Sequence, residues 1–177
     1  MTGADFNARI LLPAAALIES IRSRFADPRA HLLLLAIAGQ ESGWTDRRQI
    51  GGPARGFWQA EPNGVLAVLE NPATQRWLIL AARAQSVGID RASIYVAIEH
   101  NDPLAYAVAR LLLWADPESL PDVGDEDAAW AAYLRCWRPG KPSRERWSLR
   151  YAVAVDAAEL ASVESQPAPA GAGNMES

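Results

Sequence analysis

The residue whose type and position best suit chemistry is Glu41, at the end of an apolar helical segment. Leu34 and Ile37 precede it by seven and four positions, so the three residues share one face of the expected helix. Burial on that face and the negative end of the helix both disfavour the carboxylate, which predicts a raised pKa. An acid that stays protonated can protonate the leaving oxygen of a glycosidic bond. The alternative is a solvated glutamate on a terminal turn.

Helical periodicity runs through nearly all of the chain, and strand signals are almost absent. Asp27-Pro28 and Asp102-Pro103 are strong helix starts, with aspartate as N-cap and proline at the first helical position. We therefore predict a mainly α fold, with helices over residues 9–25, 27–43, 64–70, 74–87, 90–100, 104–114, 128–137 and 143–161.

One long interruption follows the helix that carries Glu41. Between Trp44 and Asn63 the glycines and prolines break regular structure, which predicts a shaped cleft loop or a small hairpin. A chain of 177 residues suits one domain, which we place at residues 1–163. Residues 164–177 are rich in Ala, Pro, Gly and Ser, and we expect a disordered tail there.

Charge and composition argue against several functions. The formal net charge of −4 disfavours a general nucleic-acid binder. His31 and His100 lack metal-ligand spacing with cysteines or carboxylates, so we assign no metal and no cofactor. The single cysteine, Cys136, has no partner for an internal disulfide and no evident base beside it, which indicates a structural role.

Two short strings separated by the loop resemble the glutamate-serine and glycine-leucine-methionine-glutamine motifs of soluble lytic transglycosylases and goose-type lysozymes: Glu41-Ser42 and Gly56-Phe57-Trp58-Gln59. The surrounding segments, and YLRCWRPGKP at 133–142, are similar to bacteriophage-encoded members of this lysozyme-like superfamily. The resemblance covers about residues 30–147 and implies a lysozyme-like α-helical domain.

The resemblance implies a role for each matching residue. Glu41 matches the catalytic acid/base, and Ser42 matches the residue that orients it. Gln59 matches a polar residue of the sugar cleft, and Gly56 lets the backbone approach that cleft. Trp58, with Phe57, replaces an aliphatic pair and is expected to form an apolar wall or a sugar-stacking surface.

A further matching position is Tyr133, which falls at the alanine-tyrosine-asparagine motif of the family. The sequence here is Ala132-Tyr133-Leu134, so the asparagine is missing. This departure favours an alternative function, that of a non-catalytic phage structural or assembly protein that retains a lysozyme-like fold.

The implied activity is cleavage of the β-1,4 bond between N-acetylmuramic acid and N-acetylglucosamine, with peptidoglycan glycan strands as the partner. A lytic transglycosylase needs one acid, since the 6-hydroxyl of the muramic acid closes a 1,6-anhydro ring. A hydrolase usually needs a second carboxylate. Asp46 and Glu61 lie in the loop but read as solvated acids, so we expect anhydro products more often than reducing ends.

The N-terminal segment does not read as a signal peptide. Its apolar run, residues 10–18, is interrupted by Pro13, preceded by Asp5 and followed by Glu19. No apolar run approaches the roughly 20 residues of a membrane span, so we expect no stable membrane insertion. We expect synthesis in a host cytoplasm and action on the periplasmic cell wall or from a virion.

Aromatic and basic residues offer further candidates. Trp44, Trp58 and Trp137 could stack on sugars, whereas Trp77, Trp114 and Trp130 read as core residues on helices. Six cations make the C-terminal third locally basic: Arg135, Arg138, Lys141, Arg144, Arg146 and Arg150. They either grip carboxylates of peptidoglycan or form a solvated face that pairs with the acidic segment 116–127.

Overall fold

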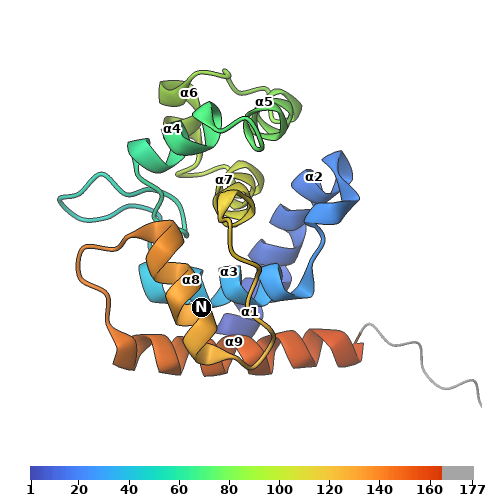
Figure 1. Cartoon of the computed structure of the whole chain (residues 1–177), viewed down its shortest axis with the longest axis vertical. Coiled ribbons are helices and arrows are strands. Elements are labelled where there is room, and N and C mark those ends of the chain that lie inside the picture. The colour runs from blue at the N-terminus through green and yellow to red at the C-terminus, as the bar shows by residue number, and fades with distance from the viewer. Residues whose placement is uncertain (165–177) are drawn as a thin grey trace, which may run out of the picture.

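The computed structural model describes residues 1–164, and in them it confirms the mainly α fold (Figure 1). The helices, in chain order, are α1 (Gly3–Phe6), η1 (Asn7–Leu11), α2 (Leu12–Ile21), η2 (Ser23–Phe25), α3 (Pro28–Ser42), α4 (Pro62–Glu70), α5 (Gln75–Ala84), α6 (Arg91–Ala97), α7 (Asp102–Ala115), α8 (Glu126–Trp137) and α9 (Arg144–Glu164). None of these helices is both long and apolar enough to cross a bilayer. The expected tail lies, after Glu164, outside the described residues.

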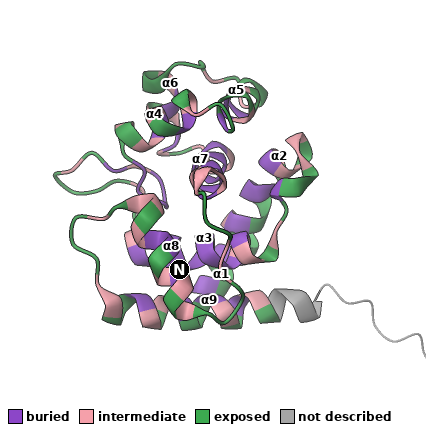
Figure 2. Ribbon diagram, in the orientation of Figure 1, coloured by how far each residue is buried: buried purple, intermediate pink, exposed green. Residues whose placement is uncertain are grey.

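Helix α3 lies at the centre of the fold, between α7 on one side and α9 on the other (Figure 1). Every residue from Leu32 to Gln40 is buried, and the ribbon coloured by burial shows α3 largely as buried (Figure 2). The helix begins where the sequence predicts: Asp27 accepts a hydrogen bond from the backbone N–H of Arg29. It ends at Gly43, which takes the left-handed conformation with φ 60° and ψ 22°.

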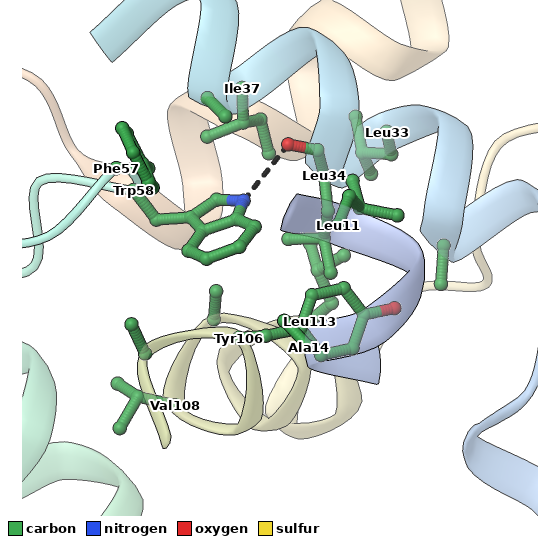
Figure 3. Packing of buried hydrophobic residues seen from close by; sticks show 14 of the residues in the cluster. Leu11, Ala14, Leu33, Leu34, Ile37, Phe57, Trp58, Tyr106, Val108 and Leu113 are labelled. Atoms are coloured by element: carbon green, nitrogen blue, oxygen red, sulfur yellow. Dashed lines mark hydrogen bonds between the residues drawn. The ribbon is translucent and has the colours of Figure 1, made fainter. Parts of the chain in front are cut away.

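Trp58 occupies the space between α3 and α7 (Figure 3). Its indole N–H donates to the carbonyl of Leu34 over 2.9 Å. The ring meets that of Tyr106 edge to face, with centroids 5.5 Å apart. Phe57 is buried beside it, in edge-to-face contact with Phe6. The two aromatic residues therefore anchor the loop in the core.

The N-terminal helical segment differs from the predicted span 9–25. It begins earlier, at α1, where Thr2 and Asp5 form a capping box. It then passes through η1, a short π-helical segment ahead of Pro13. Proline has no N–H for a regular helical hydrogen bond. The segment breaks at Arg22, whose backbone is extended. In the same way, α4 starts at Pro62 rather than at Gly64, because proline suits the first helical turn.

The loop between α3 and α4 is closed by two isolated antiparallel bridges, which join Arg48 to Arg55 and Arg55 to Ala60. In Figure 1 it projects on the left of the molecule. Glu99, in the turn that follows α6, pairs with the guanidinium groups of both Arg48 and Arg55. Arg47 pairs in a fork with Asp102 at the start of α7. These ion pairs hold the base of the loop in place.

Candidate active site

A cavity of about 1030 Å³ lies where the end of α3 meets α4, α8 and the segment that joins α8 to α9. Glu41 and Gln40 enter its wall from α3, and Gln59 and Glu61 enter from the loop. Tyr133 enters from α8. The structure therefore brings three of the sequence-predicted site residues, Glu41, Gln59 and Tyr133, to one cavity.

The half-buried carboxyl of Glu41 is the centre of this group. Its position on the last turn of α3 follows from the Gly43 cap, which ends the helix after Ser42. Burial raises the pKa of Glu41 above its ordinary value, and the negative charge of Glu61 raises that pKa further. The Tyr133 hydrogen bond and the positive charge of Arg146 lower it, without reversing the effect of burial.

Tyr133 contacts the acid directly: its hydroxyl donates to Oε1 of Glu41 over 2.6 Å. The tyrosine ring stacks on that of Trp147, with centroids 5.1 Å apart and an interplanar angle of 15°. Trp130 covers another side of the same ring. Burial raises the pKa of Tyr133, so the phenol stays a hydrogen-bond donor. The aromatic packing fixes the direction from which this donor reaches the acid.

Gln59 is fixed by the loop itself. Its backbone has a φ of 47°, and its side-chain amide donates to the carbonyl of Gly56 over 2.8 Å. A second, longer contact of 3.4 Å reaches the carbonyl of Asp46. These contacts hold the amide nitrogen of Gln59 and so fix the orientation of the side chain. A side-chain amide held in one orientation is suited to hydrogen-bond a ligand hydroxyl.

Three expected ligand contacts are not found on this cavity. The hydroxyl of Ser42 is buried and donates to the carbonyl of Ala38 over 2.8 Å, so it does not orient Glu41. The backbone at Gly56 lies close to the carbonyl of Ile98 instead: a Cβ added at Gly56 would be only 2.5 Å from that oxygen. Trp58 is buried in the core rather than exposed to a sugar.

Trp44, the other loop tryptophan, is also buried. Its indole N–H donates to the carbonyl of Leu35 over 2.9 Å. The ring lies against Gly39, where a Cβ would be 2.5 Å from the ring carbon Cζ2. Of the three tryptophans considered for sugar stacking, Trp137 is the one that lines the cavity; it is half-buried and donates to the carbonyl of Trp58 over 2.8 Å.

Sequence reasoning missed Gln40, the neighbour of the acid. It is buried, it lines the cavity, and its amide nitrogen donates to the carbonyl of Ser143 over 3.3 Å. Its Oε1 has no hydrogen-bond partner among the described residues. A buried acceptor without a partner is unfavourable, so this atom is a point of local energetic cost beside the acid. The only sequence signal was its position next to Glu41.

The two loop acids have different positions. Glu61, the N-cap residue of α4, is exposed and lines the cavity. Asp46 does not line the cavity, although its carbonyl accepts from Gln59. Glu61 is thus a further carboxylate that lines the cavity of Glu41; Asp116 also lines it, but is paired with Arg135.

The histidines and the cysteine lie in ordinary polar contacts. His31 pairs with Glu19 at 2.8 Å, and His100 lies 3.3 Å from Glu99. The thiol of Cys136 donates to Asp116 at 3.4 Å, and burial raises its pKa to about 12, which leaves it a poor nucleophile. Among the side chains that the structure describes, residues 1–159, no group of three His, Cys, Asp or Glu residues is arranged to hold a metal ion.

No family model, curated protein or solved structure matches the chain. Its chemistry is therefore inferred from the cavity. A half-buried carboxyl with a raised pKa, held by one phenol, can deliver a proton and take one back. Polar amides and an indole ring beside it can bind a hydroxyl-rich ligand.

Proposed function

We propose that the chain cleaves peptidoglycan glycan strands at the β-1,4 bond between N-acetylmuramic acid and N-acetylglucosamine, as a lytic transglycosylase or muramidase of a lysozyme-like type. The observation that carries the proposal is Glu41, a carboxyl of raised pKa on a cavity wall, hydrogen-bonded by Tyr133. The motif resemblance of Glu41-Ser42 and Gly56–Gln59 supports it.

The cavity has the size and chemistry for sugar rings. Its volume of about 1030 Å³ is at the upper end of small-ligand pockets, which run to about 1,000 Å³. Gln40, Gln59 and Asn63 offer amide groups to hydroxyls and acetamido groups. Trp137 offers part of an aromatic face.

The reaction needs one acid in two steps. Protonated Glu41 gives its proton to the bridging oxygen while the bond from that oxygen to the anomeric carbon breaks. The ionised carboxyl then takes the proton of the muramic acid 6-hydroxyl, whose oxygen bonds to the anomeric carbon and closes a 1,6-anhydro ring. Glu41 ends protonated, as it began, and no water is consumed.

This activity places the protein at the bacterial cell wall. We infer synthesis in a host cytoplasm and action on periplasmic peptidoglycan, directly or from a virion, on the strength of the resemblance to bacteriophage members of the superfamily.

Cleavage of purified sacculi by wild type and by Glu41→Gln tests the proposal. We expect wild type to clear the suspension and the variant to lose at least about a hundredfold in rate, since a general acid contributes 10²–10⁴-fold. Glu70→Gln, an exposed glutamate of α4 away from the cavity, is the matched control and should retain full activity. A Glu41→Gln variant that clears sacculi at the wild-type rate would refute the proposal.

A second function is favoured by Leu134. It lines the cavity at the position where the family motif carries asparagine, so one expected sugar contact is replaced by an apolar side chain. A protein that retains the cavity for binding, without cleavage, would act as a phage structural component. Wild type that sediments with sacculi and releases no soluble fragments would establish this second function.

A further inference from the structure

The six basic residues of the C-terminal third divide into two groups. Arg135 pairs with Asp116 at 2.8 Å, and Arg144 pairs with Glu126 at 3.1 Å. Arg150 lies over a buried tryptophan ring, with its guanidinium carbon 4.6 Å from the centroid. These three cations are therefore occupied within the fold.

The other three, Arg138, Lys141 and Arg146, line the cavity that holds Glu41. All three are exposed, and none lies within ion-pair distance of an acid among the residues that the structure describes. Arg138 is the left-handed C-cap of α8, with φ 48°, so it marks the point where the chain turns away from the helix. We call these three residues the cationic rim.

The cationic rim is exposed to solvent and also lines the cavity of Glu41. The charge of Arg146 reaches Glu41, whose pKa it lowers. The same cavity is also lined by the carboxylates of Glu61 and of Asp116, the latter paired with Arg135. The three cations of the rim still leave the cavity with an excess of positive charge, which attracts anions. Because the protein has a net charge of −4, this local excess is not part of a general basic surface.

We propose that the cationic rim binds carboxylate groups of the glycan strand, those of the lactyl ether or of the stem peptide, while Glu41 acts on the sugar backbone. This inference rests on the proposed function. It makes the protein selective for acidic, muramic acid-containing strands over neutral glycans. Three cations that line one cavity, in a chain of net negative charge, fit a few carboxylates better than the long phosphate backbone of a nucleic acid.

Binding by the Glu41→Gln protein tests the proposal without interference from cleavage. The probes are fluorescent soluble glycan strands with stem peptides, strands stripped by an amidase to leave lactyl carboxylates, and strands whose carboxylates are converted to methylamides. We expect the methylamide strands to bind about tenfold more weakly than the stemmed strands, at a few-fold for each exposed ion pair lost. The stripped strands show which carboxylate is bound.

The rim variant R138Q/K141Q/R146Q, added to Glu41→Gln, should bind all three probes equally weakly. Its control, R24Q/R83Q/R91Q, removes the same charge from exposed positions outside the cavity and should keep the preference. Unchanged preference in the rim variant, or tighter binding to single-stranded DNA than to stemmed strands, overturns the inference and leaves the proposed function intact. Absence of sacculus cleavage by wild type overturns the proposed function instead.

Discussion

The phenol of Tyr133 donates a hydrogen bond of 2.6 Å to Glu41, although the two residues are 92 positions apart in the chain. One comes from the end of α3 and the other from α8, and they meet at the wall of a single cavity. Glu41 therefore has this hydrogen-bond donor only when α8 is packed in its place.

Tyr133→Phe should change the pH dependence of cleavage. Loss of the phenol removes an interaction that lowers the pKa of Glu41, so the alkaline limb of the rate profile moves to higher pH. The rate at the optimum should fall by about ten- to a hundredfold, since the acid is less well oriented. Tyr95→Phe, which loses a hydroxyl that donates to the carbonyl of Pro53 and contacts Arg55 outside the cavity, is the control. An unmoved alkaline limb in Tyr133→Phe would count against the hydrogen bond.

Glu61→Gln should move the alkaline limb of the pH–rate profile to lower pH. The charge of Glu61 raises the pKa of Glu41, so its removal lowers that pKa, and Glu41 loses its proton at a lower pH. We expect the variant to remain active and to release 1,6-anhydro products, which mass spectrometry finds one water lighter than reducing ends. Reducing-end products from wild type, together with an inactive Glu61→Gln, would instead identify Glu61 as the base of a hydrolase.

Glu41 should reduce the stability of the folded protein as the pH rises. Its pKa is raised in the fold, so the folded state holds the proton more tightly, and this stabilisation is complete below the unfolded pKa and lost as the pH rises through the folded value. Glu41→Gln should therefore melt above wild type near pH 7, and the difference should shrink near pH 4. Thermal unfolding at both pH values measures it. A gap that widens on acidification would contradict the raised pKa.

Gly56→Ala should destabilise the protein more than Gly51→Ala does. Both glycines have positive φ, 69° and 71°, so alanine is strained at either position by about 1–2 kcal/mol. At Gly56 the new Cβ would also meet the Ile98 carbonyl oxygen at 2.5 Å, whereas nothing lies within 4 Å at Gly51. We expect about 3 kcal/mol or more of lost stability at Gly56. Equal losses in urea unfolding would show that this close approach is unimportant.

Much of the helical framework could be predicted from local signals. The Asp27-Pro28 start and the Gly43 end of α3 are caps that act through the nearest backbone groups, so neighbouring residues suffice to locate them. The position of Glu41 on an apolar face follows from the same periodicity. Spans were less accurate where one backbone feature interrupts a helix, as in the π-helical segment η1 ahead of Pro13.

The loop residues could not be placed in this way. Trp44 and Trp58 read as sugar-stacking candidates because tryptophans in a glycine-rich loop carry no periodicity. Their burial depends on distant partners. The ring of Trp44 fills the space beside Gly39, and the ring of Trp58 fills the space between α3 and α7. The Tyr133 contact with Glu41 likewise depends on the packing of α8, which no local pattern specifies.

The two walls of the cavity differ in how firmly they are built. Helix α3 is buried along most of its length, whereas α8 buries Ala129, Ala132 and Tyr133, and its other residues are half-buried or exposed. Amide hydrogen exchange should accordingly be slowest in α3 and faster in α8. Glu41 then belongs to a rigid helix, whereas its hydrogen-bond donor, Tyr133, belongs to a more mobile one. Each outward excursion of α8 would part the phenol from the carboxyl, so the width of the cavity and the proton affinity of Glu41 change together.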